Sequence, residues 1–422
     1  MANAFSKEEM VAFDDLCEEF EDTLVLSRNV SKYGTDGQLM ERANDTIWRP
    51  YPYILNSQDR IVGSAVTFQD VTQLSVPSTL GYEKTVPWTL SAKELRDVSQ
   101  WERQRKGAAQ RLASDINVAI RDKVSLEGSL VVDITGAAGD YNDIALCESM
   151  MDEQGVPAMD RYMALCTRDY NGLAGDLAAR QTLNEMAGRA YKQSYIGEVA
   201  NFQTFKIQNG TRLAANSATV TIDTTGAQVQ YVPVSTRTAA TGERSNVDNR
   251  YQQVTVSTTT GVTAGDAFTV NGLESVHHID KTSTGQAKTF RVVSVDSATT
   301  MTVTPPMIGA NQASPTDAEL AYKNIEVAST SATAAITFLN DTAAPVNPFW
   351  SMDAVELMPG RYEVPTDEGV AVLNYTSDQG VQLVLTKQFS GSTFESQFTL
   401  NTFFGVTITN TEMCGALIFG QS

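Results

Sequence analysis

Apolar residues recur every three to seven positions across residues 91–123, the spacing that places them on one face of an α-helix. This apolar stripe consists of Leu95, Val98, Trp101, Ala108, Leu112, Ile116 and Ile120. Ser91 precedes Glu94 by three residues, which is the spacing of a capping box, so we predict that the helix begins at Ser91. At 1.5 Å per residue the helix would be about 50 Å long. We expect a helix of that length to lie across a surface or along an extended molecule.

The opposite face of this predicted helix carries a basic strip. The strip consists of Arg96, Arg103, Arg105, Lys106 and Arg111. Surfaces that bind nucleic acid combine clustered basic residues with aromatic side chains, and Trp101 is the only aromatic residue here. We therefore expect the strip to face solvent or another subunit rather than nucleic acid.

Residues 4–28 form a second amphipathic pattern, in which apolar spacing is combined with a strongly acidic face. The acidic residues are Glu8, Glu9, Asp14, Asp15, Glu18, Glu19, Glu21 and Asp22. Two interpretations remain open, since such a face is either solvated or serves as a docking arm for a basic helix of another chain.

Residues 29–90 are interrupted by glycine and proline, a pattern typical of extended strands and loops. Short strand-like runs occur at residues 44–48 and 65–74. A segment of this length without a helix is unusual inside a compact domain, so we expect an arm or hairpin that packs on a neighbour.

Residues 91–210 combine helical and strand patterns, which predicts a mixed α and β region. The expected strands are residues 128–133, 161–166 and 202–207, and the expected helices after the long one are 141–153 and 170–191. From residue 334 the mixed character returns, with strands expected at residues 349–358, 369–375, 381–386, 398–408 and 414–419.

Residues 214–333 are rich in Thr, Ser, Ala, Val and Gly, and short β-prone runs recur between turn signals such as Asn271–Gly272. The runs are residues 218–222, 229–234, 252–257, 267–270, 289–295 and 301–304. Many short strands at this spacing are typical of a small barrel or sandwich. We therefore predict an inserted all-β domain.

The length, net charge and cysteine content of the chain exclude several classes of function. The chain has 422 residues, enough for two or three domains, and its net charge is −19. A balance this acidic argues against a protein whose main function is to bind nucleic acid. No apolar run is long enough to span a membrane, and the N-terminus has no pattern of a secretory signal. Four separated cysteines without a CxxC pair favour reduced thiols in a cytoplasmic setting.

Residues that carry catalytic chemistry are scarce. The two histidines, His277 and His278, are adjacent, and we expect them to be exposed in a loop. A metal site would require further ligands at suitable spacing, and the usual nucleophile and phosphate-binding motifs are absent. We predict no catalytic residue, no cofactor and no metal site. The arm, the extended segment and the long helix all require neighbours, which indicates a subunit of an assembly.

Several short stretches, collinear from about residue 44 to the C-terminus, resemble one known family. They are residues 44–48 with Pro50, 95–97 with Arg103, 108–109, 112–113, 128–130, 246–250, 260–261, Asn347 with 349–350, and 420–421. In these stretches the sequence resembles the major capsid (coat) proteins of tailed double-stranded-DNA bacteriophages. It is most similar to those of short-tailed phages of enteric bacteria, which carry an inserted β domain.

The resemblance implies an α+β fold, the capsid fold shared by tailed phages and herpesviruses. Its parts would be an N-terminal arm (1–43), an extended loop over a neighbouring subunit (44–90), and a peripheral domain (91–134) with a spine helix (91–123). An axial domain (135–213), an inserted β domain (214–333) and a return to the axial and peripheral domains (334–422) would follow. Such a chain would form hexamers and pentamers of an icosahedral shell, without an isopeptide cross-link.

The resemblance also implies contact residues and partners. A loop of the inserted domain would bridge capsomers, and the matching charges are Arg237, Glu243, Arg244, Asp248 and Arg250. A scaffolding protein would bind through a basic helix, and the candidate contacts are Glu8, Glu9, Asp14, Asp15, Glu18 and Glu19. A portal protein would be a further partner. The shell would assemble in the host cytoplasm and enclose double-stranded DNA without sequence-specific binding or a membrane.

Four alternatives stay open at the level of sequence. A bacterial nanocompartment shell shares the capsid fold but usually lacks an inserted domain. An adhesive or carbohydrate-binding protein is suggested by the Thr-rich β region alone. An enzyme is disfavoured by the lack of a recognisable site, and a tail or decoration protein would not require the arm, loop and spine.

Overall fold

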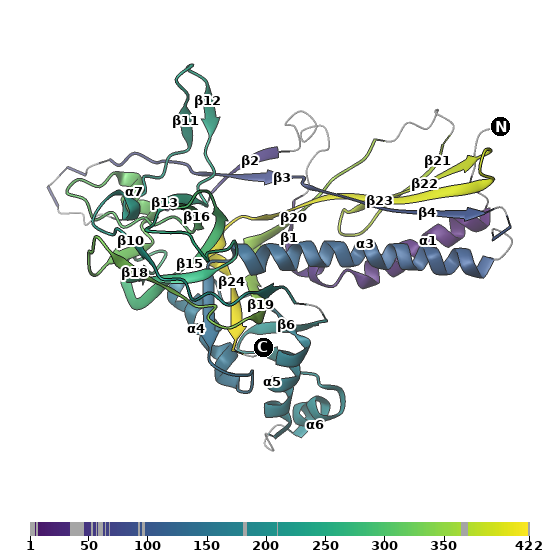
Figure 1. The fold of residues 1–422 in the computed structure, drawn as a ribbon, viewed down its shortest axis with the longest axis horizontal. Coiled ribbons are helices and arrows are strands. Elements are labelled where there is room, and N and C mark those ends of the chain that lie inside the picture. The colour runs from purple at the N-terminus through teal and green to yellow at the C-terminus, as the bar shows by residue number, and fades with distance from the viewer. Residues whose placement is uncertain are drawn as a thin grey trace. The chain divides into compact units, whose positions relative to one another are not determined.

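The chain forms two compact units, each built from several separate segments. The computed structural model describes residues 5, 7–33, 46–51, 54–55, 57, 62–63, 65–66, 68–91, 93–94, 98–179, 184–208, 210–363 and 370–420. Unit 1 comprises Met1–Ile47, Ser78–Ile120 and Glu356–Thr407, and unit 2 comprises Trp48–Pro77, Arg121–Val355 and Ile408–Ser422. Figure 1 shows the elements of both units.

Unit 1 is a long twisted sheet accompanied by two helices (Figure 1). The strand order is β1 (Ser31–Lys32), β20 (Val355–Pro359), β23 (Glu395–Ile408), β22 (Gln382–Ser390) and β21 (Ala371–Thr376). β4 (Tyr82–Ser91) also pairs with β23, antiparallel along its whole length. The helices are α1 (Lys7–Thr23) and the first part of α3 (Val98–Glu127).

The long helix α3 differs at both ends from the predicted range of 91–123. Ser91 is the last residue of β4, so the predicted helix start is wrong. The expected capping contacts do form, because Glu94 Oε2 accepts from Ser91 N at 3.0 Å and Ser91 Oγ accepts from Glu94 N at 3.3 Å. They lie ahead of the regular helix. The helix continues to Glu127 because Val124 extends the buried apolar stripe.

The N-terminal helix α1 packs through Phe13, Leu16 and Phe20, which are buried. It is shorter than the predicted span of 4–28 and is followed by a 3₁₀ turn, Leu26–Asn29. Asn117 of α3 fixes this end of α1, since its amide donates to Thr23 O at 3.1 Å and accepts from Leu26 N at 3.2 Å. A helix terminus leaves backbone groups unpaired, and Asn117 supplies two of the missing partners.

Unit 2 contains a second sheet that mixes parallel and antiparallel pairs. Its order is β5 (Leu130–Ile134), β24 (Cys414–Phe419), β19 (Ala344–Ser351), β6 (Arg161–Cys166), β8 (Phe202–Ile207) and β7 (Glu198–Val199), and β9 (Arg212–Leu213) pairs with β19. α4 (Tyr141–Gln154), α5 (Thr167–Ala179) and α6 (Asn184–Gln193) accompany it. The predicted strands at 161–166, 202–207 and 414–419 are confirmed with the same bounds.

The other sheet of unit 2 is entirely antiparallel and carries the expected all-β character. Its order is β10 (Val220–Ile222), β18 (Ala334–Phe338), β14 (Ala267–Val276), β15 (Ser283–Val295), β16 (Thr300–Thr304) and β13 (Gln252–Thr255), and β17 (Ile325–Val327) pairs with β14. In the core beside this sheet the ring of Phe268 stacks on that of Phe290, with ring centroids 5.6 Å apart, and its centroid lies 6.2 Å from that of Phe338. A short helix, α7 (Asp317–Tyr322), follows β16.

Two predictions within this β region are wrong. Asn271–Gly272 is not a turn, because β14 runs through it, and Gly272 with φ +87° lies at a shift in the strand register. A β-bulge and a turn can both require a glycine in the left-handed conformation, so a sequence such as Asn-Gly does not distinguish between them. Residues 229–234 are not a strand, since a 3₁₀ helix covers Ala227–Val229 and Gln230 makes an isolated bridge to Ile308.

The extended segment begins with β2 (Thr46–Pro50) and ends with β3 (Ser75–Thr79), which pair with each other. The run at 65–74 was expected to be a strand, but none of its described residues is in one. Tyr51 N donates to Leu74 O at 2.8 Å, which continues the pairing. No helix among the described residues is long and apolar enough to cross a membrane.

Candidate interaction surfaces

A two-stranded hairpin projects from the β region of unit 2 (Figure 1). It consists of β11 (Thr236–Thr238) and β12 (Arg244–Asn246), which pair from Thr236↔Asn246 to Thr238↔Arg244. Its turn is closed by a hydrogen bond from Ala239 N to Glu243 O at 2.8 Å. Every residue from 236 to 246 is exposed, so the side chains of Arg237, Glu243 and Arg244 are accessible.

Asp248 and Arg250 do not share this exposure, which corrects the prediction that they contribute to the same contact. Arg250 is only 8% exposed. Its guanidinium holds Asp248 in a bidentate pair, with Nε–Oδ1 at 3.0 Å and Nη2–Oδ2 at 2.7 Å, and its Nη1 donates to Ile408 O at 2.9 Å. Although burial opposes the charged form, the carboxylate of Asp248 raises the pKa of Arg250. These two residues anchor the base of the hairpin.

Further hydrogen bonds fix the hairpin base. Ser75 Oγ of β3 donates to Val247 O at 3.0 Å, and Asn249 Nδ2 donates to Val234 O at 2.9 Å. The sequence alone does not show which charged residues of this loop lie at its exposed tip and which lie at its buried base. The difference arises from packing, because the chain turns back into the sheet after residue 246.

The acidic face of α1 is partly occupied by bonds within unit 1. Lys387 Nζ pairs with Glu9 at 2.7 Å, and Lys106 Nζ lies 3.5 Å from Glu19. Asp14, Asp15 and Glu18 are exposed, whereas the side chain of Glu8 lies outside the described residues. The structure therefore leaves the middle of α1 as its accessible acidic surface.

The basic strip on α3 is narrower than predicted. Arg103, Lys106 and Arg111 are exposed, and Arg96 lies outside the described residues. Arg105 is only 2% exposed, so its place on a solvent face is wrong. It precedes Ala108, Ala109 and Leu112 by three, four and seven positions, and this spacing places it on the buried face of the helix.

Exposed apolar residues gather on the extended segment between β2 and β3. They are Leu55, Val62, Val66, Phe68 and Val71, and Phe68 is 94% exposed. Asp70 N donates to Asp317 Oδ2 at 3.1 Å, and Tyr322 Oη donates to Thr72 O at 3.1 Å, so part of the segment lies against α7. A run of exposed apolar side chains indicates a surface that another molecule covers.

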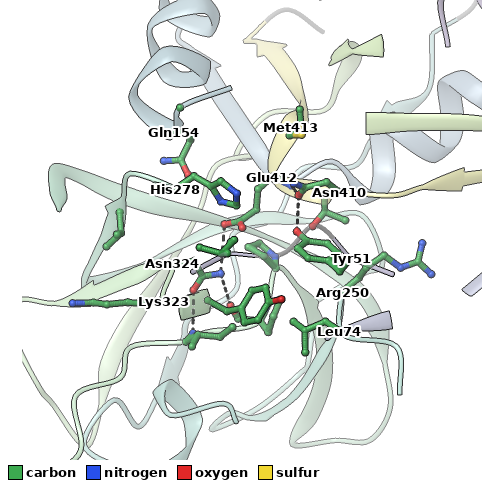
Figure 2. Close-up of a pocket in the computed structure, with 18 of the residues that line it drawn as sticks. Tyr51, Leu74, Gln154, Arg250, His278, Lys323, Asn324, Asn410, Glu412 and Met413 are labelled. Atoms are coloured by element: carbon green, nitrogen blue, oxygen red, sulfur yellow. Dashed lines mark hydrogen bonds between the residues drawn. The ribbon is translucent and has the colours of Figure 1, made fainter. Parts of the chain in front are cut away.

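Unit 2 also contains a cavity of about 270 Å³, lined mainly by apolar atoms with several polar side chains among them, which no sequence motif predicts (Figure 2). Two of its lining residues, Glu412 and Gln154, accept hydrogen bonds from Lys288 Nζ, which lies 2.5 Å from Glu412 Oε1 and 3.0 Å from Gln154 Oε1. Tyr51 donates to Asn410 Oδ1 at 2.8 Å on another side (Figure 2). Lys288 is 124 residues from Glu412 and 134 from Gln154, and such distant pairs leave no mark in local sequence.

Burial and neighbouring charges shift the pKa values of the titratable groups around this cavity. Burial would raise the pKa of Glu412, but Lys288, His278 and Lys281 outweigh it and the pKa is lowered. Burial lowers the pKa of His278, and it lowers the pKa of Lys281 to about 8. His277 and His278 are half-buried rather than exposed as predicted. Among the described residues, no group of three or more metal-ligating side chains gathers.

The charged hairpin, the middle of the acidic helix α1 and the apolar extended segment all carry exposed side chains, and sequence comparison identifies the family. A model of the P22 coat protein, gene protein 5, matches residues 1–420. The chain belongs to the P22 coat protein family. It is therefore a major capsid protein that forms an icosahedral shell, with the mixed helix and sheet fold of phage capsids. This confirms the expected resemblance and indicates a structural rather than enzymatic role in the virion.

Three solved structures illustrate the similarity. One from Mycobacterium phage Che8 has 9% identity and a TM-score of 0.46, and the match covers 94% of this chain and 90% of that one. The capsid of cyanophage P-SCSP1u has 11% identity and a TM-score of 0.43, with 93% and 86% covered. The CUS-3 coat protein I-domain is 33% identical over 30% of this chain and 99% of the domain, with a TM-score of 0.22. The family assignment itself rests on the sequence match over residues 1–420.

Proposed function

We propose that this coat protein assembles as hexamers and pentamers, together with a scaffolding protein and a portal protein, into a procapsid in the host cytoplasm. The procapsid then takes up double-stranded DNA. The observation that carries the proposal is the match to the family over residues 1–420, combined with three separate exposed surfaces. Chains in closed shells need contacts that repeat by symmetry, and each surface suits a different one.

The hairpin of β11 and β12 is the proposed contact between capsomers. It presents Arg237, Glu243 and Arg244 on a short two-stranded ribbon whose base is fixed by the Asp248–Arg250 pair. Where two copies of a loop meet across a two-fold axis, a loop with both signs of charge pairs with itself. The exposed apolar residues of the extended segment would lie on a neighbouring subunit within the capsomer.

The accessible middle of α1 is the proposed site for the scaffolding protein. Asp14, Asp15 and Glu18 are exposed on one helix, and a basic helix offers the complementary charge. Glu9 and Glu19 are less suitable than predicted, because Lys387 and Lys106 already pair with them. The net charge of −19 would also disfavour binding of packaged DNA to the inner wall.

Charge exchange on the hairpin tests the capsomer contact. We expect Arg244→Glu to lower the yield of closed shells by about tenfold, since like charges then meet across the axis. The double variant with Glu243→Arg and Arg244→Glu restores both signs and is expected to recover shells. The measurement is sedimentation of assembled particles followed by electron microscopy. Normal shells from the single variant, or no recovery in the double variant, would refute pairing across a two-fold axis.

A further inference from the structure

The cavity of unit 2 lies where three separate stretches of the chain meet (Figure 2). Its apolar side chains come from the extended segment, from the residues after α4 and from the β region, and they include Ile54, Leu74, Val156, Val276 and Ile308. An apolar cavity of about 150 Å³ accommodates benzene, so about 270 Å³ leaves room for a ligand of about ten non-hydrogen atoms. His278, Lys281 and Lys323 of the lining are only half-buried, so small solutes can reach the cavity.

Lys281 brings to this cavity a positive charge that no carboxylate of the described residues neutralises at ion-pair distance. Its Nζ donates one hydrogen bond, to Lys323 O at 3.1 Å, whereas an ammonium group has three N–H donors. The other charged side chains of the lining are already paired, as Arg250–Asp248, Lys323–Glu326 and Glu412–Lys288. Burial lowers the pKa of Lys281 to about 8, although the charge of Glu412 opposes the shift. A ligand with one negative charge would supply the missing partner.

Asn410 gives the cavity a second unused donor group. The residue is 6% exposed, and its Oδ1 accepts hydrogen bonds from Tyr51 Oη at 2.8 Å and from Glu412 N at 3.0 Å (Figure 2). These two donors fix the orientation of the amide. Its Nδ2 donates no hydrogen bond to any residue that the structure describes. A buried donor without an acceptor costs free energy, so an oxygen atom of a bound molecule would stabilise this part of the cavity.

We propose that the cavity binds a small monocarboxylate with an apolar body, whose carboxylate lies beside Lys281 and whose body lies among the apolar side chains. A single negative charge matches the single unpaired ammonium group, and the mainly apolar lining disfavours a more highly charged ligand. A cationic ligand of the same size would add to the unpaired charge of Lys281. The ligand would contact three distant stretches of the chain at once, so its binding would stabilise the folded unit against unfolding.

Two probes of suitable size test the site, octanoate with an aliphatic body and 3-phenylpropionate with an aromatic one. We expect titration calorimetry of the full-length subunit at pH 7 to show one site with a Kd at or below about 1 mM for at least one of them. Octylamine, the cationic counterpart of octanoate, is expected not to bind. The probe that binds more tightly identifies the kind of body, aliphatic or aromatic, that the cavity prefers.

Substitutions locate the bound probe. Lys281→Met keeps the length of the side chain but removes its charge, and it is expected to weaken binding by at least about tenfold, the effect of losing a hydrogen bond to a charged group. Leu74→Phe fills part of the cavity and is also expected to weaken binding. Lys192→Met, at an exposed position of α6, is the control and is expected to bind the probe like the unchanged chain.

Four results would overturn the proposal. They are no binding of either probe at millimolar concentration, equally tight binding of octylamine, unchanged binding in Lys281→Met or in Leu74→Phe, and a loss in Lys192→Met as large as that in Lys281→Met. Because the titrations use the unassembled subunit, these results are independent of whether the chain forms shells.

Discussion

At the scale of residues, the Asp248–Arg250 pair holds the hairpin to the sheet of unit 2. Both side chains are largely shielded from solvent, and Arg250 makes two bonds to Asp248 and one to a backbone oxygen. Loss of one partner leaves a buried guanidinium without its counter-charge. We expect Asp248→Asn to lower the free energy of unfolding by about 3 kcal/mol, measured by urea denaturation of the subunit.

The Arg111–Asp115 pair on α3 is the control for this prediction, because the side chain of Arg111 is 69% exposed whereas that of Arg250 is 7% exposed. Arg111 Nη2 lies 3.2 Å from Asp115 one helical turn away, and Arg111 is open to solvent. We expect Asp115→Asn to change the free energy of unfolding by less than about 0.5 kcal/mol, since solvent screens such pairs. Equal effects of the two substitutions would contradict the structural role given to Arg250.

Lys281 makes stability depend on pH. Burial lowers its pKa from 10.5 to about 8, against the opposing effect of Glu412 and with help from Lys288 and Lys323. Between about pH 8 and 10.5 the unfolded chain holds a proton that the folded chain has released. The contribution of Lys281 therefore makes the free energy of unfolding rise with pH in this window. Below about pH 8 Lys281 is charged in both states, and the full free-energy cost of burying its charge lowers the stability of the folded chain.

The pH dependence is measured by comparing the parent chain with Lys281→Met in urea denaturation from pH 7 to 10. As the pH rises across the window, the unfolding free energy of the parent is expected to increase relative to that of the variant. Thiols and tyrosines titrate in both chains, so the difference removes them. A difference that stays constant with pH would show that Lys281 keeps its ordinary pKa.

Single residues also mark the limit of prediction from sequence. The stripe on α3 correctly places Leu112, Ile116 and Ile120 in the core, because helical spacing alone decides this. The same rule, applied without regard to charge, would have placed Arg105 there too. Gly272 was assigned to a turn because a bulge and a turn need the same backbone freedom. The local sequence predicts the left-handed backbone conformation of Gly272, but it does not show whether the flanking residues continue one strand or turn back.

At the scale of elements, Asn117 couples α1 to α3. Its two hydrogen bonds satisfy the last carbonyl of α1 and the first amide of the 3₁₀ turn. We expect Asn117→Ala to destabilise this junction by about 1–3 kcal/mol, since it leaves two backbone groups without their partner. Faster hydrogen exchange of amides in residues 20–29 is the measurement.

Gln110→Ala is the control, because the Gln110–Glu19 hydrogen bond of 3.3 Å lies at the exposed surface. Its effect on exchange in residues 20–29 is expected to be small. If the scaffolding protein binds α1 in its docked position, Asn117→Ala will also weaken that binding more than Gln110→Ala does. Unchanged exchange in Asn117→Ala would contradict the coupling of the two helices.

Elements with strong internal patterns were predictable from sequence, whereas those defined by distant partners were not. The strand at 161–166 is mostly apolar and fully buried, the strand at 202–207 combines Phe202, Phe205 and Ile207 with polar residues, and α4 has a capping box at Asp140. β4 contains Pro87 and lies in the range 29–90, where strands and loops are expected but no run is predicted at this position. It pairs with β23, more than 300 residues away, from Tyr82↔Phe404 onward. Proline is tolerated where its missing amide is not needed by the ladder.

At the scale of the whole molecule, the coat function was predictable because short motifs keep their order along most of the chain. The match to the P22 coat protein over residues 1–420 agrees with that order. The cavity of unit 2 was not predictable, since it depends on how the folded chain brings distant residues together. Copies with a charge of −19 repel one another, so shell contacts must offset that repulsion.

The central claim is that copies of this chain build a closed shell. The most direct measurement is negative-stain electron microscopy of the purified protein, alone and with its scaffolding partner. We expect uniform closed shells, with yield and uniformity dependent on the partner and reduced when Asp14, Asp15 and Glu18 are replaced by lysine. A monodisperse monomer or small oligomer under both conditions would contradict the account.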